Sequence, residues 1–414
     1  MDYTMVPNDE AKRQEEDVQI VKPKKIWRNL VAYWLLGLCN NYGYVVMLSA
    51  ANDILHTQGG DADVHNDVPV NDGNGTDHRD CNYISTGAIL LADILPSLII
   101  KLIAPFLPFF VHVRVGICIV LASAGFLVVA FSTGQWMSIL GVIVTSFSSG
   151  LGEVTYLQYS SFYDKDVVST WSSGTGGAGV FGALSYAALN KLGLRNALLI
   201  MLIVPVTMGI SFWGILKSPE ERNELSTQHN VNEEEIKNPK SAFMKKIKQV
   251  PGLLKFMIPL GLVYLFEYFI NQGMFELINF DNFFIDSKEQ YRWLQVDYQI
   301  GVFISRSSVN LIHIKKIWLM SVLQLINVAI FTTEAVFYYV PTFWIVLVLT
   351  LWEGLLGGAA YVNTFYKIST DVPEEDKQFS MGVTSFADAI GITFAGIFSM
   401  FAHNAICDLP KPQR

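Results

Sequence analysis

Charged residues are scarce in this sequence. They make up 16% of the 414 residues, whereas a soluble globular chain carries about 25%. The acidic residues behind the net charge of −8 fall mainly between long apolar stretches, so the net charge itself says little about nucleic acid. We expect no nucleic-acid partner, and so little charge is typical of a protein that lies in a membrane.

Cysteine is rare as well, and the signatures of soluble enzymes are missing. The four cysteines fit no zinc-binding spacing, and the sequence has no phosphate-binding loop, no H-E-x-x-H and no supported G-x-S-x-G. His56, His65 and His78 fall in one polar segment, where solvated histidines are more common than a metal site. We therefore expect neither enzymatic activity nor a cofactor or metal.

Long apolar runs are what the sequence has instead. A helix that crosses a bilayer needs about 20 apolar residues, and about eleven runs meet that length. We predict an all-α integral membrane protein with a major-facilitator-like bundle of these helices in two pseudo-repeated halves. The predicted spans are 30–51, 83–104, 114–132, 137–160, 172–190, 196–216, 256–277, 291–311, 316–335, 341–366 and 379–402.

The distribution of lysine and arginine predicts which side each connection faces, because basic residues gather at cytoplasmic helix ends. Residues 1–29 form a polar tail that is basic near the first span, so we place the N-terminus in the cytoplasm. Residues 52–82 contain a single basic residue, Arg79, and are predicted to be luminal. The same loop contains the sequon Asn74-Gly75-Thr76, so we predict glycosylation of Asn74.

A long connector divides the chain. Residues 217–255 are rich in lysine and are predicted to be cytoplasmic, between a six-helix half at 30–216 and a five-helix half at 256–402. Eleven spans leave the tail at 403–414 on the luminal side. Within the connector, KSAFMKKIKQVPGLLKF is either a basic amphipathic helix on the membrane surface or a solvated approach to the seventh span.

Two faint internal echoes support the division into halves. GEVTYLQYSSFY, from Gly152, matches GGAAYVNTFYKI, from Gly357, at one constant offset, and the first span's Asn-Tyr-Gly echoes an Asn-Gln-Gly in the seventh. These stretches fall in the first, fourth, seventh and tenth spans. Those four are the equivalent inner helices of a transporter built from two six-helix halves.

One glycine-rich stretch imitates a nucleotide-binding motif. WSSGTGGAGVFGALSY, from Trp171, contains G-x-G-x-x-G twice, but no acidic residue follows at the distance that a dinucleotide fold needs. Ala178 and Gly182, like Gly179 and Ala183, instead form a small-residue face of the kind that allows close helix packing in lipid. Whether this packing is static or slides during transport stays open.

Seven of the charged residues inside the predicted spans are candidates for a transport role, because an ionised group there costs about 2.5–3.5 kcal/mol and usually lines a cavity. Glu267 lies one helical turn from Asn271, so the two share a face. Asp93 and Lys101 lie two turns apart on similar faces, so the long lysine could partly neutralise that region. Burial favours the neutral form of a carboxyl group, which would suit proton exchange. Arg306 could instead snorkel at a helix end, and Glu353 could lie at a span boundary. The seven are Asp93, Lys101, Glu153, Glu267, Arg306, Glu353 and Asp388.

Several stretches together resemble the battenin family of lysosomal membrane proteins. They run from the first span to the last and include WLLGLCNNYGYVVMLSAANDIL, LLADILPSLIIKLIAP, SSGLGEVTY, WSSGTGGAG, EYFINQGMFEL, QYRW, SRSS and EGLLGGAAYVNTF. The resemblance implies a multi-pass protein of the lysosomal or late endosomal membrane with eleven spans. It also implies a part in clearing glycerophosphodiesters, in lysosomal pH and in the handling of basic amino acids.

A phosphodiester with polyol ends needs a cation and hydrogen-bonding groups in one cavity. Arg306 and Lys101 are the available cations, and the candidate polyol contacts are Asn41, Tyr44, Asn271, Gln272, Tyr361 and Asn363. The leading interpretation is therefore a transporter of a small polar metabolite. The alternatives are a scaffold that regulates lysosomal pH and trafficking, with an apolar interior, and a basic amino acid carrier, with an acidic cavity that lacks Arg and Lys.

The sequence departs from the family in its terminal and sorting signals. Cys407 is followed by DLPKPQR, so a prenylation box is absent. The fold that the resemblance implies makes the second and eleventh helices neighbours, with Cys81 and Cys407 near their luminal ends, so we predict a Cys81–Cys407 disulfide. Sorting adaptors are expected to read the cytoplasmic tail and connector. The candidate signals are the acidic run Glu233 to Glu235, without its paired apolar residues, and Tyr3-Thr4-Met5-Val6.

Overall fold

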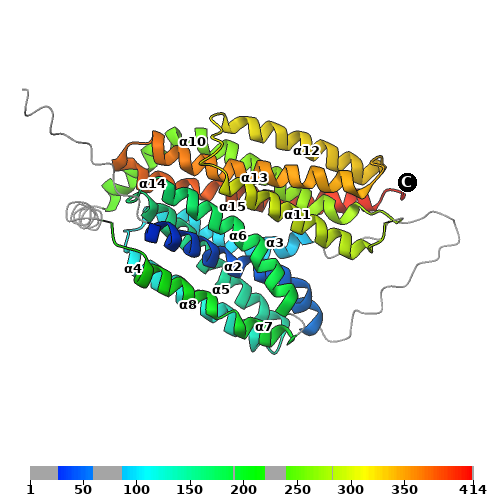
Figure 1. The fold of residues 1–414 in the computed structure, drawn as a ribbon, viewed down its shortest axis with the longest axis horizontal. Helices are drawn as coiled ribbons and strands as arrows, with labels where there is room; N and C mark the ends of the chain where they lie inside the picture. Colours follow the sequence, from blue (N-terminus) through cyan, green and yellow to red (C-terminus); the bar gives the residue numbers. More distant parts are fainter. Residues whose placement is uncertain (1–26, 59–85, 190–191, 220–238, 282, 413–414) are drawn as a thin grey trace, which may run out of the picture.

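The computed structural model describes residues 27–58, 86–189, 192–219, 239–281 and 283–412. Over these residues the chain forms a bundle of eleven helical segments that run roughly along the long axis of the molecule (Figure 1). In chain order they are α2 (Trp27–Gln58), α3 (Thr86–Ile103), α4 (Val111–Ala130), α5 (Gln135–Ser160), α6 (Asp166–Leu189), the run α7 (Leu194–Ile200), α8 (Ile203–Gly209) and η3 (Ile210–Ile215), α10 (Pro239–Phe269), α11 (Ser287–Ser307), α12 (Ile317–Phe337), α13 (Phe343–Asp371), and α14 (Glu374–Thr384) with α15 (Phe386–Cys407).

The apolar character of the bundle's surface marks it as a membrane protein. Seven of the described helical stretches are long and apolar enough to cross a bilayer, and α2, α3, α6 and α11 complete the predicted set of eleven. Large apolar side chains such as Val120, Ile203 and Val348 are about two-thirds exposed on the outside. Polar and charged side chains lie inside, which is the arrangement expected in lipid.

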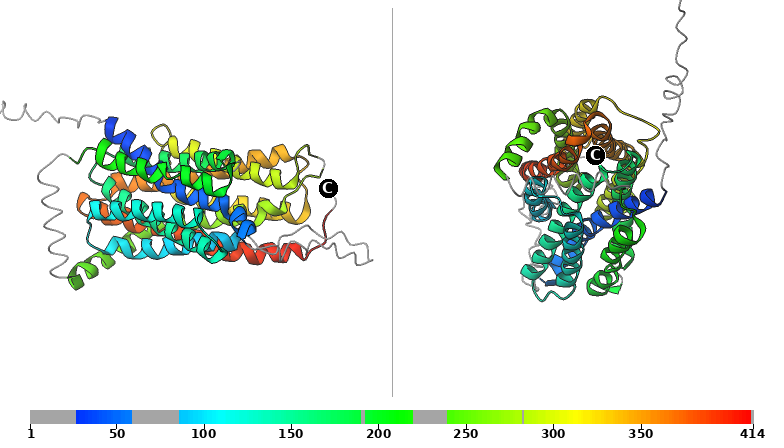
Figure 2. Two further views of the ribbon diagram at one scale, coloured as in Figure 1. Left: turned by 90° about the horizontal axis from the view of Figure 1, so that it is seen from below. Right: turned by 90° about the vertical axis from the view of Figure 1, so that its left-hand side faces the viewer.

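The helices form two groups. Seen end-on in Figure 2, the helices of residues 27–216 gather on one side and those of residues 239–407 on the other. Helix α2 begins at one end of the bundle and the chain finishes at the opposite end (Figure 1), as an odd number of spans requires. The first of these ends, at Trp27, is called the α2-start end below.

Corresponding helices pack in the same way in the two groups. Helix α2 packs on α6 as α10 packs on α15, and α3 packs on α5 as α11 packs on α13. Helix α3 also crosses to α15, and α6 crosses to α11. These equivalent contacts support the repeat that the sequence echoes suggested.

Glycines make the closest of these helix contacts. A methyl group on Gly174 would lie 3.0 Å from the Leu38 nitrogen and would overlap the Trp34 carbonyl oxygen. On the facing helix, a methyl group on Gly37 would overlap the Trp171 carbonyl oxygen. In the other half, Gly391 lies against α10 at Leu265. The glycine-rich stretch therefore serves close helix packing, as the sequence predicted.

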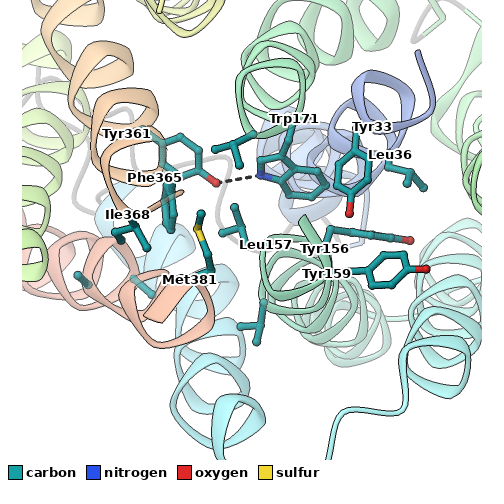
Figure 3. Close-up of a cluster of buried hydrophobic side chains, with 14 of the residues drawn as sticks. Tyr33, Leu36, Tyr156, Leu157, Tyr159, Trp171, Tyr361, Phe365, Ile368 and Met381 are labelled. Atoms are coloured by element: carbon teal, nitrogen blue, oxygen red, sulfur yellow. Dashed lines mark hydrogen bonds between the residues drawn. The ribbon is translucent and has the colours of Figure 1, made fainter. Parts of the chain in front are cut away.

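The internal echo at residues 152 and 357 has a structural counterpart. An added methyl group on Gly152 would overlap the Asn40 side chain, and one on Gly357 would overlap the Glu267 carboxyl group. Each glycine thus makes room for a polar side chain from the first helix of its own half. The paired tyrosines, Tyr156 and Tyr361, are both buried in the cluster drawn in Figure 3.

Several helices do not begin or end where the predicted spans do. The seventh helix begins at Pro239 rather than at residue 256, the eighth ends at Ser307 rather than at residue 311, and the last runs on to Cys407. The basic segment therefore forms the first part of α10, with Pro251 inside the helix, and both interpretations of it stay predictions. Hydropathy locates the bilayer, whereas a helix can extend into water beyond it.

Candidate functional site

A buried ion-pair group joins the two halves. The Lys101 ammonium, on α3, lies 2.7 Å from Glu153 Oε2 on α5 and donates to both Asp388 carboxylate oxygens on α15, at 3.0 and 3.1 Å. All three side chains are less than one-tenth exposed. One cation thus holds a carboxylate from each half of the bundle.

Tyr361 extends this group through hydrogen bonds. Its hydroxyl donates to Glu153 Oε1 at 2.7 Å and accepts from Trp171 Nε1 at 3.2 Å, the contact dashed in Figure 3. Tyr361 lies on α13 and Trp171 on α6, so both bonds cross between the halves. The Glu153 carboxylate therefore has a partner on each of its oxygens.

Arg306 is a second buried cation where the two halves meet. It donates to Thr175 Oγ1 and to the Tyr264 hydroxyl, each at 2.7 Å, and its guanidinium lies 4.2 Å from the centre of the Tyr361 ring. Only 9% of the residue is exposed. Although Arg306 is at the end of α11, it points into the bundle, so the snorkelling alternative is wrong.

Together these residues form what we call the central cluster: Lys101, Glu153, Trp171, Thr175, Tyr264, Arg306, Tyr361 and Asp388. Removing one partner of a buried ion pair typically costs about 3–5 kcal/mol, because the other charge is left unpaired. The central cluster is therefore a strong link between the halves as long as its partners stay in place. Its two cations are also the chemistry needed to hold an anion.

A second group contains buried carboxyl groups with few partners. Glu267 accepts a hydrogen bond from the Tyr298 hydroxyl, and its other oxygen has none. Glu353 is fully buried, both of its oxygens lack a hydrogen-bond partner, and it lies within electrostatic reach of Glu267. Glu353 therefore does not lie at an exposed span boundary, and that alternative is wrong.

Asp93 is likewise buried with both oxygens unpartnered. The sequence suggested that the Lys101 cation could partly neutralise the region around Asp93. Lys101 instead turns to Glu153 and Asp388, because it projects from the far end of α3 toward α5 and α15. Unpaired buried carboxylates are costly, so Asp93 and Glu353 are suited to carrying a proton.

The amide residues of the seventh span lie where α10 changes to a π-helical turn, η4 (Ile270–Met274), followed by the short η5 (Phe275–Leu277). Asn271 and Gln272 are both buried there. The Asn271 carbonyl accepts from Gln295 Nε2 at 3.2 Å, while its side-chain oxygen has no partner. Such turns are frequent at functional sites.

The other predicted polyol contacts lie outside the central cluster. Asn41 is half-buried and accepts from Asn40 at 3.2 Å, and the half-buried Tyr44 pairs with Tyr268 through their hydroxyl groups. Asn363 accepts from the Ile314 backbone nitrogen at 2.8 Å and donates to the Ala359 carbonyl at 2.9 Å. Its amide thus fixes the loop before α12.

Sequence reasoning missed Thr175, Tyr264, Trp171 and Tyr298. A hydroxyl or an indole in an apolar run carries no charge to draw attention, and each of these residues acts through a partner on another helix. Trp171 was within reach, since it opens the glycine-rich stretch that the motif search had already singled out.

Some predicted sites fall outside the described residues. Asn74, Cys81, Tyr3 and the acidic run at 233–235 are among them, so glycosylation and the sorting signals stay predictions. Cys407 is disulfide-bonded, whereas Cys39 and Cys118 are free and buried. Because Cys81 is not described, the Cys81–Cys407 pairing also stays a prediction.

Comparison with known sequences places the chain among a well-defined set of relatives. The family model described as CLN3 protein matches residues 31–242 and 220–409. The chain is 43% identical to battenin from Canis lupus familiaris, over 93% of this chain and 92% of that protein. It is 35% identical to protein BTN1 from Chaetomium globosum, over 91% and 88% of the two chains.

The fold of the chain is similar to that of two solved membrane proteins. The human organic anion transporter MFSD10 superposes with a TM-score of 0.60 at 12% identity, over 92% of this chain and 96% of that one. A bacterial homologue of the human lysosomal transporter Spinster, inward-facing and unoccupied, gives 0.52 at 13% identity, over 91% and 82%. At this identity the likeness concerns the fold alone.

Proposed function

The chain belongs to the CLN3 protein family and has a major-facilitator-like fold, and on that premise we propose that it exports glycerophosphodiesters or a related small polar metabolite across the lysosomal membrane. The coarse role, a transporter-like membrane protein, follows from the family and the fold. The substrate, the proton coupling, the compartment and the effect on lysosomal pH are the parts proposed here.

The observation that carries this proposal is the pair of buried cations between the halves. Arg306 lies among threonine and tyrosine hydroxyls, and the Tyr361 hydroxyl reaches a carboxylate that holds Lys101. Cations beside hydroxyl groups are the chemistry that a phosphodiester with polyol ends requires. In the closed arrangement described here, Glu153 and Asp388 hold Lys101. An anionic substrate would compete with these carboxylates for the cation and so loosen the link between the halves.

The central cluster also weighs on the two alternatives. A basic amino acid carrier was expected to have an acidic site without Arg or Lys, yet both cations are present and buried. A non-transporting scaffold was expected to have an apolar interior, yet the interior is polar where the halves meet. The first observation favours an anionic substrate over a basic amino acid, and the second favours a transporter over a scaffold.

The carboxyl groups of the second group supply the proposed proton pathway. Glu353 and Asp93 are buried without hydrogen-bond partners, and Glu267 has one. Exchange of a proton with an acidic lumen would change their charge as the halves move. We expect Glu353→Gln to keep substrate binding and to lose the dependence of transport on a pH gradient, measured in vesicles with and without that gradient.

The direct test is uptake of a radiolabelled glycerophosphodiester by vesicles that contain the purified chain. Arg306→Lys keeps the charge but cannot reach both Thr175 and Tyr264, so we expect KM to rise at least about tenfold, as expected for the loss of one to two charge-assisted hydrogen bonds. Lys411→Gln, far from the central cluster, is the matched control and should leave KM unchanged.

Two results would contradict the proposal. One is that wild-type vesicles take up no labelled glycerophosphodiester in either direction of the pH gradient. The other is that uptake is robust and that Arg306→Lys, Glu153→Gln and Glu267→Gln all transport like the wild type. The second result would leave a transporter whose site lies elsewhere.

A further inference from the structure

A cleft of about 220 Å³ lies at the α2-start end of the bundle, away from the central cluster. Its walls come from α10, from the start of α12 and from the last turns of α13. The residues that matter here are Lys255, Lys315, Lys367, Asp371, Phe256 and Trp318. None of the functions proposed above uses this cleft.

The cleft is positively charged. Three lysines face a single acidic residue, Asp371, whose carboxylate accepts a hydrogen bond from the Thr370 hydroxyl at 3.0 Å. Among the ion pairs of the described residues, none includes Lys255, Lys315 or Lys367. Within the part of the chain that the structure describes, the three ammonium groups therefore form no ion pair with a carboxylate.

The local backbone adds to this field. Helix α12 begins at Ile317, on the wall of the cleft, and its first turn has no capping side chain. The start of a helix carries a partial positive charge. Lys367 Nζ donates to the Lys315 carbonyl at 3.2 Å, which fixes the α13 side of the cleft against the loop that leads into α12.

The surroundings of the cleft point to a lipid rather than to a free ion. Trp318 is 55% exposed on the cleft wall, and indole rings of this kind favour the boundary between headgroups and acyl chains. Exposed Leu254 and Ile258 lie on α10 beside Lys255. The lysines therefore meet an apolar flank that acyl chains can cover while the headgroup occupies the cleft.

We propose that this cleft binds the phosphorylated headgroup of an anionic lipid in the adjoining leaflet. By the predicted sidedness this is the cytoplasmic leaflet, where anionic lipids and basic juxtamembrane residues attract each other. The proposal does not depend on the substrate of the transporter.

The test measures binding to the purified full-length chain in neutral detergent. The probes are a short-chain phosphatidylinositol phosphate, its inositol phosphate headgroup alone, inorganic phosphate and short-chain phosphatidylcholine. We expect the phosphorylated lipid to bind and to raise the melting temperature, while the other three probes give no comparable shift. The double variant Lys255→Gln/Lys367→Gln should weaken binding of the phosphorylated lipid about fivefold for each lysine removed. The double variant Lys255→Arg/Lys367→Arg keeps both charges and should bind it like the wild type.

The matched control is Lys240→Gln/Lys245→Gln, which removes two lysines of the first part of α10 that do not line the cleft. We expect it to weaken binding less than twofold. Equal binding of the headgroup alone would overturn the lipid as the ligand. Equal losses in the control and cleft variants, or no binding of any probe, would overturn the site.

Discussion

At the scale of single residues, the central cluster depends on a few atoms that serve both halves at once. The Tyr361 hydroxyl bonds to Glu153 and Trp171, while its ring lies under the Arg306 guanidinium. Tyr361 thus contacts Arg306 directly and reaches Lys101 through the Glu153 carboxylate. A change to this residue should affect binding more than folding.

Tyr361→Phe tests this role. The ring and its contact with Arg306 stay, but Glu153 Oε1 loses its donor, which costs about 1–3 kcal/mol for a buried polar group. We expect transport of labelled glycerophosphodiester to fall about tenfold.

Tyr338→Phe is the matched control, because it also removes a buried hydroxyl, one that donates to the Leu277 carbonyl at 2.9 Å, far from the cluster. It should lower the melting temperature and leave transport per folded molecule near the wild-type rate. If both variants reduce transport equally, the effect is one of stability and not of the cluster.

The charged members of the cluster could be predicted from the sequence, because an ionised residue stands out in an apolar run. Their pairing could not. Lys101 and Asp388 are 287 positions apart, and the nearer acid on the same helix, Asp93, suggested the wrong neighbour. Uncharged partners such as Thr175 and Tyr264 carry no signal in the sequence, since only the packing of α6 and α10 against α11 brings them to Arg306.

At the scale of elements, glycine sets the distance between the helices of each half. The number of helices and the glycine packing were predictable, because run length and small-residue spacing are local properties of the sequence. The limits of α10 and α11 were not, because polar helical turns at the membrane surface look like loops in a hydropathy pattern.

Gly174→Ala tests the crossing of α2 and α6. The added methyl group overlaps the Trp34 carbonyl, and overpacking of this kind typically costs about 1–3 kcal/mol. We expect a clear fall in the melting temperature in detergent. Gly116→Ala on α4 is the control, since nothing lies within 4 Å of its added methyl group, and it should be neutral or slightly stabilising. Equal melting temperatures for the two variants would refute the packing role.

At the scale of the whole molecule, the account requires the two halves to separate where the central cluster now joins them. Besides the cluster, the Ser173 and Ser307 hydroxyls lie 2.9 Å apart across the boundary between α6 and α11. Lys165, before α6, lies 5.6 Å from the Tyr366 ring on α13. These contacts hold the α2-start end closed, and alternating access must break them.

The most direct measurement is transport by a chain whose halves are covalently joined at this point. Ser173→Cys/Ser307→Cys places two thiols at the 2.9 Å contact, and the cross-link is verified by mass mapping. The single variant Ser173→Cys and the wild type receive the same reductant, which controls for reduction of the Cys407 disulfide. The account predicts no glycerophosphodiester uptake while the cross-link is intact and recovery once it is reduced. Undiminished uptake by the fully cross-linked chain would contradict it.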